Sequence, residues 1–192
     1  LIANVLFTRT VQQLPLFINN STLSMRGTAL NEVAPAAFAN VAFLAWRRNV
    51  LVEVQNSFLV AGGGPRGSVN VEFYGGGWTD VGVVVMVLQS TLVVTSTVLK
   101  DVKTGNIALR WTQGASIVLL CNASVLSCVG TLKAANILVE PFLNSSAIAI
   151  QNCMLNASTM TLRSLRSVNV YASGGLQNTS LTVVGTNMSA GS

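Results

Sequence analysis

The feature that most constrains this fold is a repeat of short strand-like segments. Five of them start with a small residue, continue as an alternating apolar run and end in Thr, Asn or Cys: STLSMRGTAL from Ser21, STLVVTSTVL from Ser90, ASIVLLCNASVL from Ala115, SAIAIQNCML from Ser146 and TSLTVVGTNM from Thr179. A second family precedes them: NVLVEV from Asn49, VNVEF from Val69, NIALRW from Asn106, NILVEPF from Asn136 and VNVYA from Val168. Alternation with period two predicts β-strands.

In the C-terminal half the two families alternate with a regular spacing. A residue of the second family is followed by its partner in the first family at similar distances, as in the pairs Ile107 and Ile117, Ile137 and Ile148, and Asn169 and Leu181. One coil takes about 31 residues. Each coil has room for a third strand, such as SVLSCV from Ser124 or TMTLRSL from Thr159. We therefore predict an all-β fold, a single-stranded parallel β-helix of the right-handed, pectate-lyase type.

The physical reason is that one coil cannot bury its own apolar side chains. Coils stacked about 4.8 Å apart form a continuous dry core and saturate their backbone hydrogen bonds. Short strands with turn signals are also compatible with a β-sandwich, the alternative fold. A sandwich, however, gives no reason for strands to recur as coils of similar sequence.

The organisation expected is one β-helix segment over residues 1–192, cut from a longer chain. Coils are irregular in 1–105, with glycine-rich loops near 61–68 and 74–80, and regular in 106–192. The uncharged stretch Val81–Leu99 is long enough to span a membrane. We favour two buried strands that meet at a corner formed by Gln89 and Ser90.

Composition argues against most catalytic chemistry. The chain has no histidine and only six acidic residues, so it lacks the usual general base and most zinc ligands. Glu53 and Glu72, nineteen residues apart in like strands, come nearest to a pair of catalytic acids. We predict no catalytic, cofactor or metal site. The alternative is a polysaccharide lyase-like or hydrolase-like β-helix whose catalytic residues lie mostly outside these residues.

The net charge of +5 comes from scattered basic residues. Nucleic-acid binding requires a basic stripe interleaved with aromatic residues, which is not visible, so we expect no nucleic-acid partner. Aromatic and Arg side chains near loops are the usual recognition anchors. The candidates for ligand contact are Trp46, Arg47, Arg66, Tyr74 and Trp78.

The three cysteines, Cys121, Cys128 and Cys153, lack the CxxC spacing of metal or redox sites. Alignment of SIVLLCN from Ser116 with AIAIQNC from Ala147 brings Cys121 and Cys153 within one position of each other on adjacent coils. They could form a disulfide or stack as buried thiols.

Seven of the 17 asparagines begin an N-x-[ST] sequence, and these candidate N-glycosylation sites are Asn19, Asn20, Asn122, Asn144, Asn156, Asn178 and Asn187. They fall where strands turn, as glycans require. The competing explanation is structural, because asparagine tolerates the left-handed geometry of β-helix corners.

The coils have low charge and are rich in Val, Asn, Ser and Thr. With runs such as VLLCNASVLSCV from Val118 and IAIQNCMLNAS from Ile148, they resemble the large repetitive surface proteins of kinetoplastid protozoa, including the dispersed gene family proteins of trypanosomes. The resemblance implies a non-catalytic, glycosylated ectodomain at the cell surface or outside the cell. Its role would be structural or adhesive, and a membrane segment outside this sequence would anchor it. The implied partners are a host or matrix protein, or a glycan.

Overall fold

The computed structural model contains only β-structure in the residues that it describes. These residues are 2–26, 38–45, 47–63, 67–74, 81–95, 103–110, 116–121, 123–130, 133–140, 143–144, 146–159, 166–172 and 176–191.

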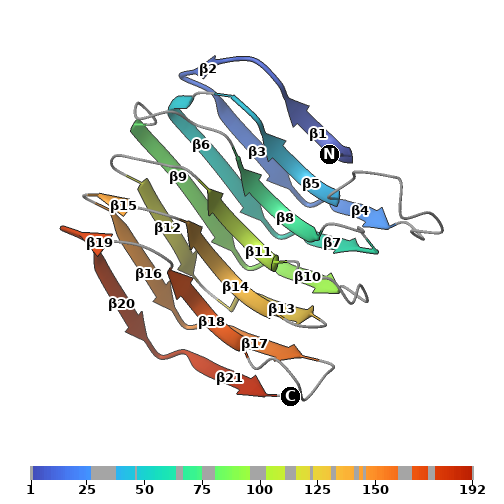
Figure 1. Ribbon diagram of the computed structural model, residues 1–192, viewed down its shortest axis with the longest axis vertical. Helices are drawn as coiled ribbons and strands as arrows, with labels where there is room; N and C mark the ends of the chain where they lie inside the picture. The colour runs from blue at the N-terminus through green and yellow to red at the C-terminus, as the bar shows by residue number, and fades with distance from the viewer. Residues whose placement is uncertain are drawn as a thin grey trace.

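The strands form three parallel sheets that run the length of the molecule (Figure 1). Sheet A contains β1 (Ile2–Phe7), β5 (Phe38–Phe43), β8 (Ser68–Phe73), β11 (Lys103–Arg110), β14 (Lys133–Glu140) and β18 (Arg166–Ala172). Sheet B contains β2 (Val11–Gln12), β3 (Pro15–Asn19), β6 (Arg47–Gln55), β9 (Val81–Leu88), β12 (Ser116–Cys121), β16 (Ala147–Gln151) and β20 (Ser180–Val184). Sheet C contains β4 (Thr22–Arg26), β7 (Phe58–Gly62), β10 (Thr91–Thr95), β13 (Val125–Gly130), β17 (Met154–Thr159) and β21 (Asn187–Gly191). The short strands β15 (Leu143–Asn144) and β19 (Leu176–Gln177) pair beside sheet B.

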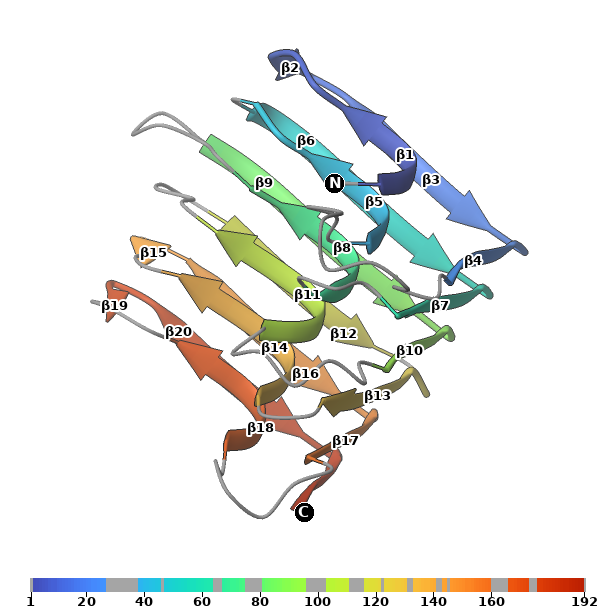
Figure 2. The same ribbon diagram turned by 45° about the vertical axis from the view of Figure 1, so that its right-hand side comes forward.

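The chain visits the sheets in the order A, B, C and then begins again, so each coil places one strand on its counterpart in the coil before (Figure 2). This confirms the predicted parallel β-helix. In sheet A, Lys133 pairs with Lys103, thirty residues earlier, and with Arg166, 33 residues later, close to the predicted repeat. In the N-terminal half, Ala39 pairs with Val69 and Val69 with Gly105, which are steps of thirty and 36 residues.

The two strand families do not each correspond to one sheet. The segment from Asn49 belongs to sheet B, whereas the other members of its family lie in sheet A. The family that begins at Ser21 is divided between sheets B and C. The third strand predicted from Thr159 is instead β17, Met154–Thr159, and residues 160–165 lie outside the described residues. Both errors arise because an apolar alternation looks the same in every sheet.

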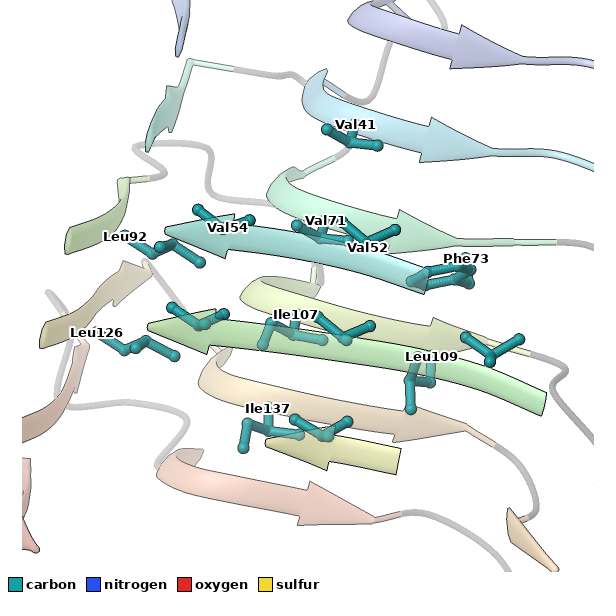
Figure 3. Packing of buried hydrophobic residues seen from close by; sticks show 14 of the residues in the cluster. Val41, Val52, Val54, Val71, Phe73, Leu92, Ile107, Leu109, Leu126 and Ile137 are labelled. Atoms are coloured by element: carbon teal, nitrogen blue, oxygen red, sulfur yellow. The ribbon is translucent and has the colours of Figure 1, made fainter. Parts of the chain in front are cut away.

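Inward-facing side chains stack in columns along the helix axis. Sheet C contributes one leucine from each of four successive coils, Leu59, Leu92, Leu126 and Leu155, all fully buried. Figure 3 shows the equivalent stacking of Ile107 and Ile137 in sheet A. The rings of Phe7, Phe43 and Phe73 lie nearly parallel, with centroids 4.6 and 4.8 Å apart.

A row of asparagines, the asparagine ladder, lines the inside of the bend in sheet A. Its members are Asn4, Asn40, Asn70, Asn106, Asn136 and Asn169, one on each strand of the sheet. Nδ2 of each member before Asn169 donates to Oδ1 of the next member at 2.6 to 2.8 Å. Each Nδ2 also donates to a carbonyl of sheet C at 2.8 to 3.1 Å. The ladder therefore joins successive coils and ties sheet A to sheet C.

A second polar row, the hydroxyl ladder, lines the corner between sheets B and C. Its members are Ser21, Ser57, Ser90, Ser124, Cys153 and Thr186. Backbone N–H groups of the row donate to the hydroxyl one coil further along, at 3.0 to 3.4 Å. Hydroxyls such as that of Ser90 donate back to the preceding coil, here to the carbonyl of Val54 at 3.2 Å. Buried polar groups that are satisfied in this way do not oppose folding.

The Val81–Leu99 stretch forms β9 and β10, and the chain turns between them at Gln89 and Ser90, as predicted for two buried strands. Residues 96–99 lie outside the described residues. In the part of the chain that the structure describes, no helix is long and apolar enough to cross a membrane.

Candidate functional site

The corner between sheets B and C presents a row of exposed side chains directly outside the hydroxyl ladder. Asn20, Asn56, Gln89 and Asn152 occupy equivalent corner positions, and all have φ between 47° and 52°. Asparagine adopts this left-handed region more readily than other non-glycine residues because its short amide bonds to the local backbone. The carboxamides of the row are therefore held outside the helix while the hydroxyl ladder occupies the inside.

A shallow groove of about 500 Å³ runs along the N-terminal part of this corner. Its lining residues are Asn20, Ser21, Thr22, Asn56, Ser57, Phe58, Gln89 and Thr91. The Phe58 side chain is 42% exposed, and Phe17, which points outward from β3, is 60% exposed. Exposed amides beside an exposed aromatic ring, here Phe58, are suited to weak recognition of a polar macromolecule.

The candidate glycosylation sites can be placed on this framework. Asn20 and Asn178 are corner residues with positive φ, and Asn19, Asn156 and Asn187 lie on strands. All five are exposed. Asn122 lies outside the described residues, as does the side chain of Asn144. The structural explanation for corner asparagines therefore holds at Asn20 and Asn178, and it is compatible with an attached glycan because both side chains face solvent.

The outer face of sheet A carries an ion pair. Nη1 of Arg110 on β11 lies 3.0 Å from Oε1 of Glu72 on β8. Glu72 is buried, and burial raises the pKa of its carboxyl above the ordinary value of 4.5, an effect that Arg110 opposes. Glu140 lies opposite Arg110 in the register of β11 and β14.

The prediction that Glu53 and Glu72 lie in like strands is wrong. Glu53 lies on β6 of sheet B and pairs with Met86, whereas Glu72 lies on β8 of sheet A and pairs with Ala108. Their similar flanking residues reflect a shared alternation and not a shared sheet. Within the described residues, no three Cys, Asp or Glu side chains come close enough to hold a metal ion.

The register also bears on the cysteines. Cys121 pairs with Gln151, while Cys153 lies at the level of Ser124 in the hydroxyl ladder. The Cys153 thiol donates to the carbonyl of Gln151 at 3.1 Å, and the side chain of Cys121 lies outside the described residues. The disulfide stays a prediction that this register disfavours. Cys128 is fully buried, which raises the pKa of its thiol to about 12.

Of the predicted ligand contacts, Arg47 lies inside the molecule. Its side chain is 1% exposed, and its Nη1 donates to the carbonyl of Phe43 at 3.3 Å. The guanidinium carbon lies 5.5 Å from the centroid of Phe73, a cation–π contact that caps the phenylalanine stack. The prediction that Arg47 is a surface contact is therefore wrong. Tyr74 is 46% exposed, and Trp46, Arg66 and Trp78 lie outside the described residues.

Sequence reasoning missed both ladders. The signal for the asparagine ladder was present, because an Asn recurs two or three residues after the start of each sheet A strand, as in Phe38–Phe43 and Ser68–Phe73. The signal for the hydroxyl ladder was the Ser, Cys or Thr that follows each corner residue. Each signal emerges only when the coils are aligned by sheet.

Comparison of this chain with protein-family models, with curated proteins and with solved structures finds no match. The fold and the geometry of the corner are therefore the basis for a functional proposal.

Proposed function

We propose that this chain is a segment of a rigid, glycosylated β-helical rod outside the cell, with a structural or adhesive role and no catalytic one. The observation that carries the proposal is the position of the sequon asparagines. All five whose side chains are described are exposed, and two occupy corner positions where the backbone turns the side chain away from the core. A glycan at these positions would project from the rod without disturbing either ladder.

The interior is consistent with a structural role. Both ladders satisfy buried polar groups with uncharged partners from neighbouring coils, so coils can be stacked without metal ions. Stability in such a solenoid is approximately the sum of contacts between neighbouring coils. The corner groove, which Phe58 lines, is the surface that we expect to contact a host or matrix macromolecule.

The carbohydrate-active alternative has less support from the geometry. Paired catalytic carboxylates act across a bound sugar at a separation of about 5 to 10 Å. Glu53 and Glu72 lie on different sheets, and Glu72 is buried against Arg110. No described pair of free carboxylates on one sheet favours this second function.

The test is secretion of residues 1–192 from eukaryotic cells, with glycan occupancy read at each asparagine by peptide mass spectrometry. We expect occupancy at Asn20 and Asn178, and the Asn20→Gln and Asn178→Gln variants should each lose one glycan and keep their β-sheet circular dichroism. A secreted, folded protein without any glycan at the exposed sequons would contradict the proposal.

The chain offers a matched control. Asn56 occupies the same corner as Asn20 one coil further on. Two residues after Asn56 the chain has Phe58, whereas two residues after Asn20 it has Thr22, and Phe58 pairs with Thr22 in the register. The Phe58→Thr variant makes Asn56 a sequon. We expect it to gain one glycan, because the position and not the sequence alone admits the sugar. Absence of that gain would show that the corner does not present its asparagine.

A further inference from the structure

We infer that one edge of the rod, where the chain passes from sheet C to sheet A, binds a linear sulfated polysaccharide. This basic edge consists of Arg26, Lys103, Lys133 and Arg166, each at the end of a sheet C strand or the beginning of a sheet A strand. In Figure 1 the arrowheads of the sheet C strands point to one side of the stack, and the sheet A strands begin on that side. The inference names a partner for the proposed rod and rests on that proposal for the location outside the cell.

Three of the four cations are in register on successive coils. Lys133 pairs with Lys103 on one side and with Arg166 on the other, so their Cα atoms form a column with about 4.8 Å between neighbours. Like charges directly opposite one another on neighbouring strands are destabilising. A column of three cations is therefore better explained by a ligand of opposite charge than by the stability of the coils.

Arg26 extends the basic edge to an earlier coil. It ends β4 of sheet C, and its side chain is exposed. The sequence between the strands of this edge adds three basic and two acidic residues outside the described residues: Arg66, Lys100, Arg163, Glu32 and Asp101. The basic edge is defined without them. Its four positions are spread along the rod axis, which suits a linear polyanion better than a single small anion.

The other two edges of the rod differ in charge. The segments that lead from sheet B to sheet C, such as 20–21 and 89–90, contain no charged residue. At the edge between sheets A and B the two signs are mixed, because Arg110 pairs in register with Glu140 and forms its ion pair with Glu72. The fold thus gathers along one edge cations that are far apart in the sequence.

The geometry favours a polysaccharide over other polyanions. An anionic membrane presents a plane of charge, whereas the basic edge presents a line. Binding of single-stranded nucleic acid relies on aromatic side chains on which bases stack, and no aromatic residue lies in the register column of Lys103, Lys133 and Arg166. A sulfated polysaccharide carries its charges along one chain and is abundant outside cells.

The test measures binding of the 192-residue chain to heparin, a sulfated polysaccharide, by isothermal titration calorimetry at several salt concentrations. We expect binding whose logarithm of affinity falls linearly with the logarithm of the salt concentration, because ionic contacts release counterions from a linear polyanion. Desulfated heparin should not bind. Absence of heparin binding at physiological salt, or equal binding of the desulfated polymer, would overturn the inference.

The double variant Lys103→Gln with Lys133→Gln tests the edge itself. Its affinity for heparin should fall about tenfold or more, and the slope of the salt dependence should decrease by about 2, one for each lost contact. The matched control is Arg9→Gln with Arg48→Gln, at exposed positions outside the basic edge. Both double variants lower the net charge from +5 to +3, so an equal loss of affinity would assign binding to net charge and overturn the inference.

If the first double variant fails to fold by circular dichroism, Arg26→Gln with Arg166→Gln takes its place, with the same expected loss. Stronger binding of anionic lipid vesicles or of duplex DNA than of heparin would overturn the choice of partner. Glycan occupancy is measured separately. Unglycosylated protein that binds heparin would therefore contradict only the proposed glycosylation, and occupied sequons without heparin binding would contradict only this inference.

Discussion

The bend in sheet A and the corner between sheets B and C both use asparagine, but for different physical reasons. Inside the bend, an asparagine is present on every strand, because only a carboxamide can accept from one neighbour and donate to two others. At the corner, the equivalent residues are Asn20, Asn56, Gln89, Ala123, Asn152 and Gly185, which share only a positive φ. The interior position therefore depends on chemistry, and the corner position depends on backbone geometry.

The largest loss in the free energy of unfolding is expected from a substitution in the asparagine ladder, inside the bend of sheet A. Asn106→Leu keeps a similar volume but leaves the side-chain Nδ2–H of Asn70, the carbonyl of Ser127 and Oδ1 of Asn136 without their partner. Each buried polar group left unsatisfied costs about 1 to 3 kcal/mol, so we expect a loss of about 3 kcal/mol or more in the free energy of unfolding. Urea denaturation followed by circular dichroism measures it. A loss below about 1 kcal/mol would show that the ladder is not required.

A smaller loss in the free energy of unfolding is expected from a substitution in the hydroxyl ladder, inside the corner between sheets B and C. Ser90→Ala removes the hydroxyl that accepts the N–H of Ser57 and donates to the carbonyl of Val54 or Leu88. We expect a loss of about 1 to 2 kcal/mol by the same urea measurement. The Ser90→Thr variant keeps the hydroxyl and should recover most of it. Equal destabilisation by both variants would assign the effect to packing and not to hydrogen bonding.

The neutral ladders can also be contrasted with the charged group on the outer face of sheet A. Because burial raises the pKa of Glu72, the native state holds a proton that the unfolded state releases as the pH rises above 4.5. The contribution of Glu72 to the free energy of unfolding therefore falls as the pH increases from 4.5, the ordinary pKa, through the raised pKa of the native state. Glu72→Gln should lack this fall, and denaturation at several pH values compares the two proteins. A difference that does not change with pH would contradict the raised pKa.

The smallest effect is expected outside the corner. Asn56→Gly changes an exposed residue with φ of 47° to one that adopts this region without cost, so the free energy of unfolding should change by less than about 0.5 kcal/mol. Asn56→Val, whose branched side chain opposes a positive φ, should cost about 1 to 2 kcal/mol. If Asn56→Gly destabilised the protein as much as Asn106→Leu, the distinction between the two positions would fail.

The sequence predicted the class of fold because period-two alternation and a recurring coil are local signals. Ile148 is buried, but the register pairs it with Val118, so Ile117 is not its equivalent. Assignment of strands to sheets requires knowledge of which coil positions are in register, and insertions between strands change that register by several residues. Arg47 illustrates the same limit, since only the three-dimensional stack reveals that its guanidinium covers Phe73.

The exposure of the sequon asparagines was only partly predictable. Asn20 and Asn178 could be expected at corners because asparagine favours left-handed geometry. Asn156 begins no turn, and its exposure follows from the outward phase of β17, where Leu155 and Ala157 occupy the core. That phase depends on tertiary packing and is not determined by the Asn-x-Ser sequence itself.

Hydrogen exchange of asparagine side-chain amides tests the distinction between the two classes most directly. In protein labelled with ¹⁵N-asparagine, the NH₂ groups of the buried members Asn70, Asn106 and Asn136 should exchange far more slowly than those of the exposed corner residues Asn20, Asn56 and Asn152. Substitution of each residue in turn assigns its signal. Exchange of the buried and corner carboxamides at the same rate would contradict an interior asparagine ladder that holds the coils together.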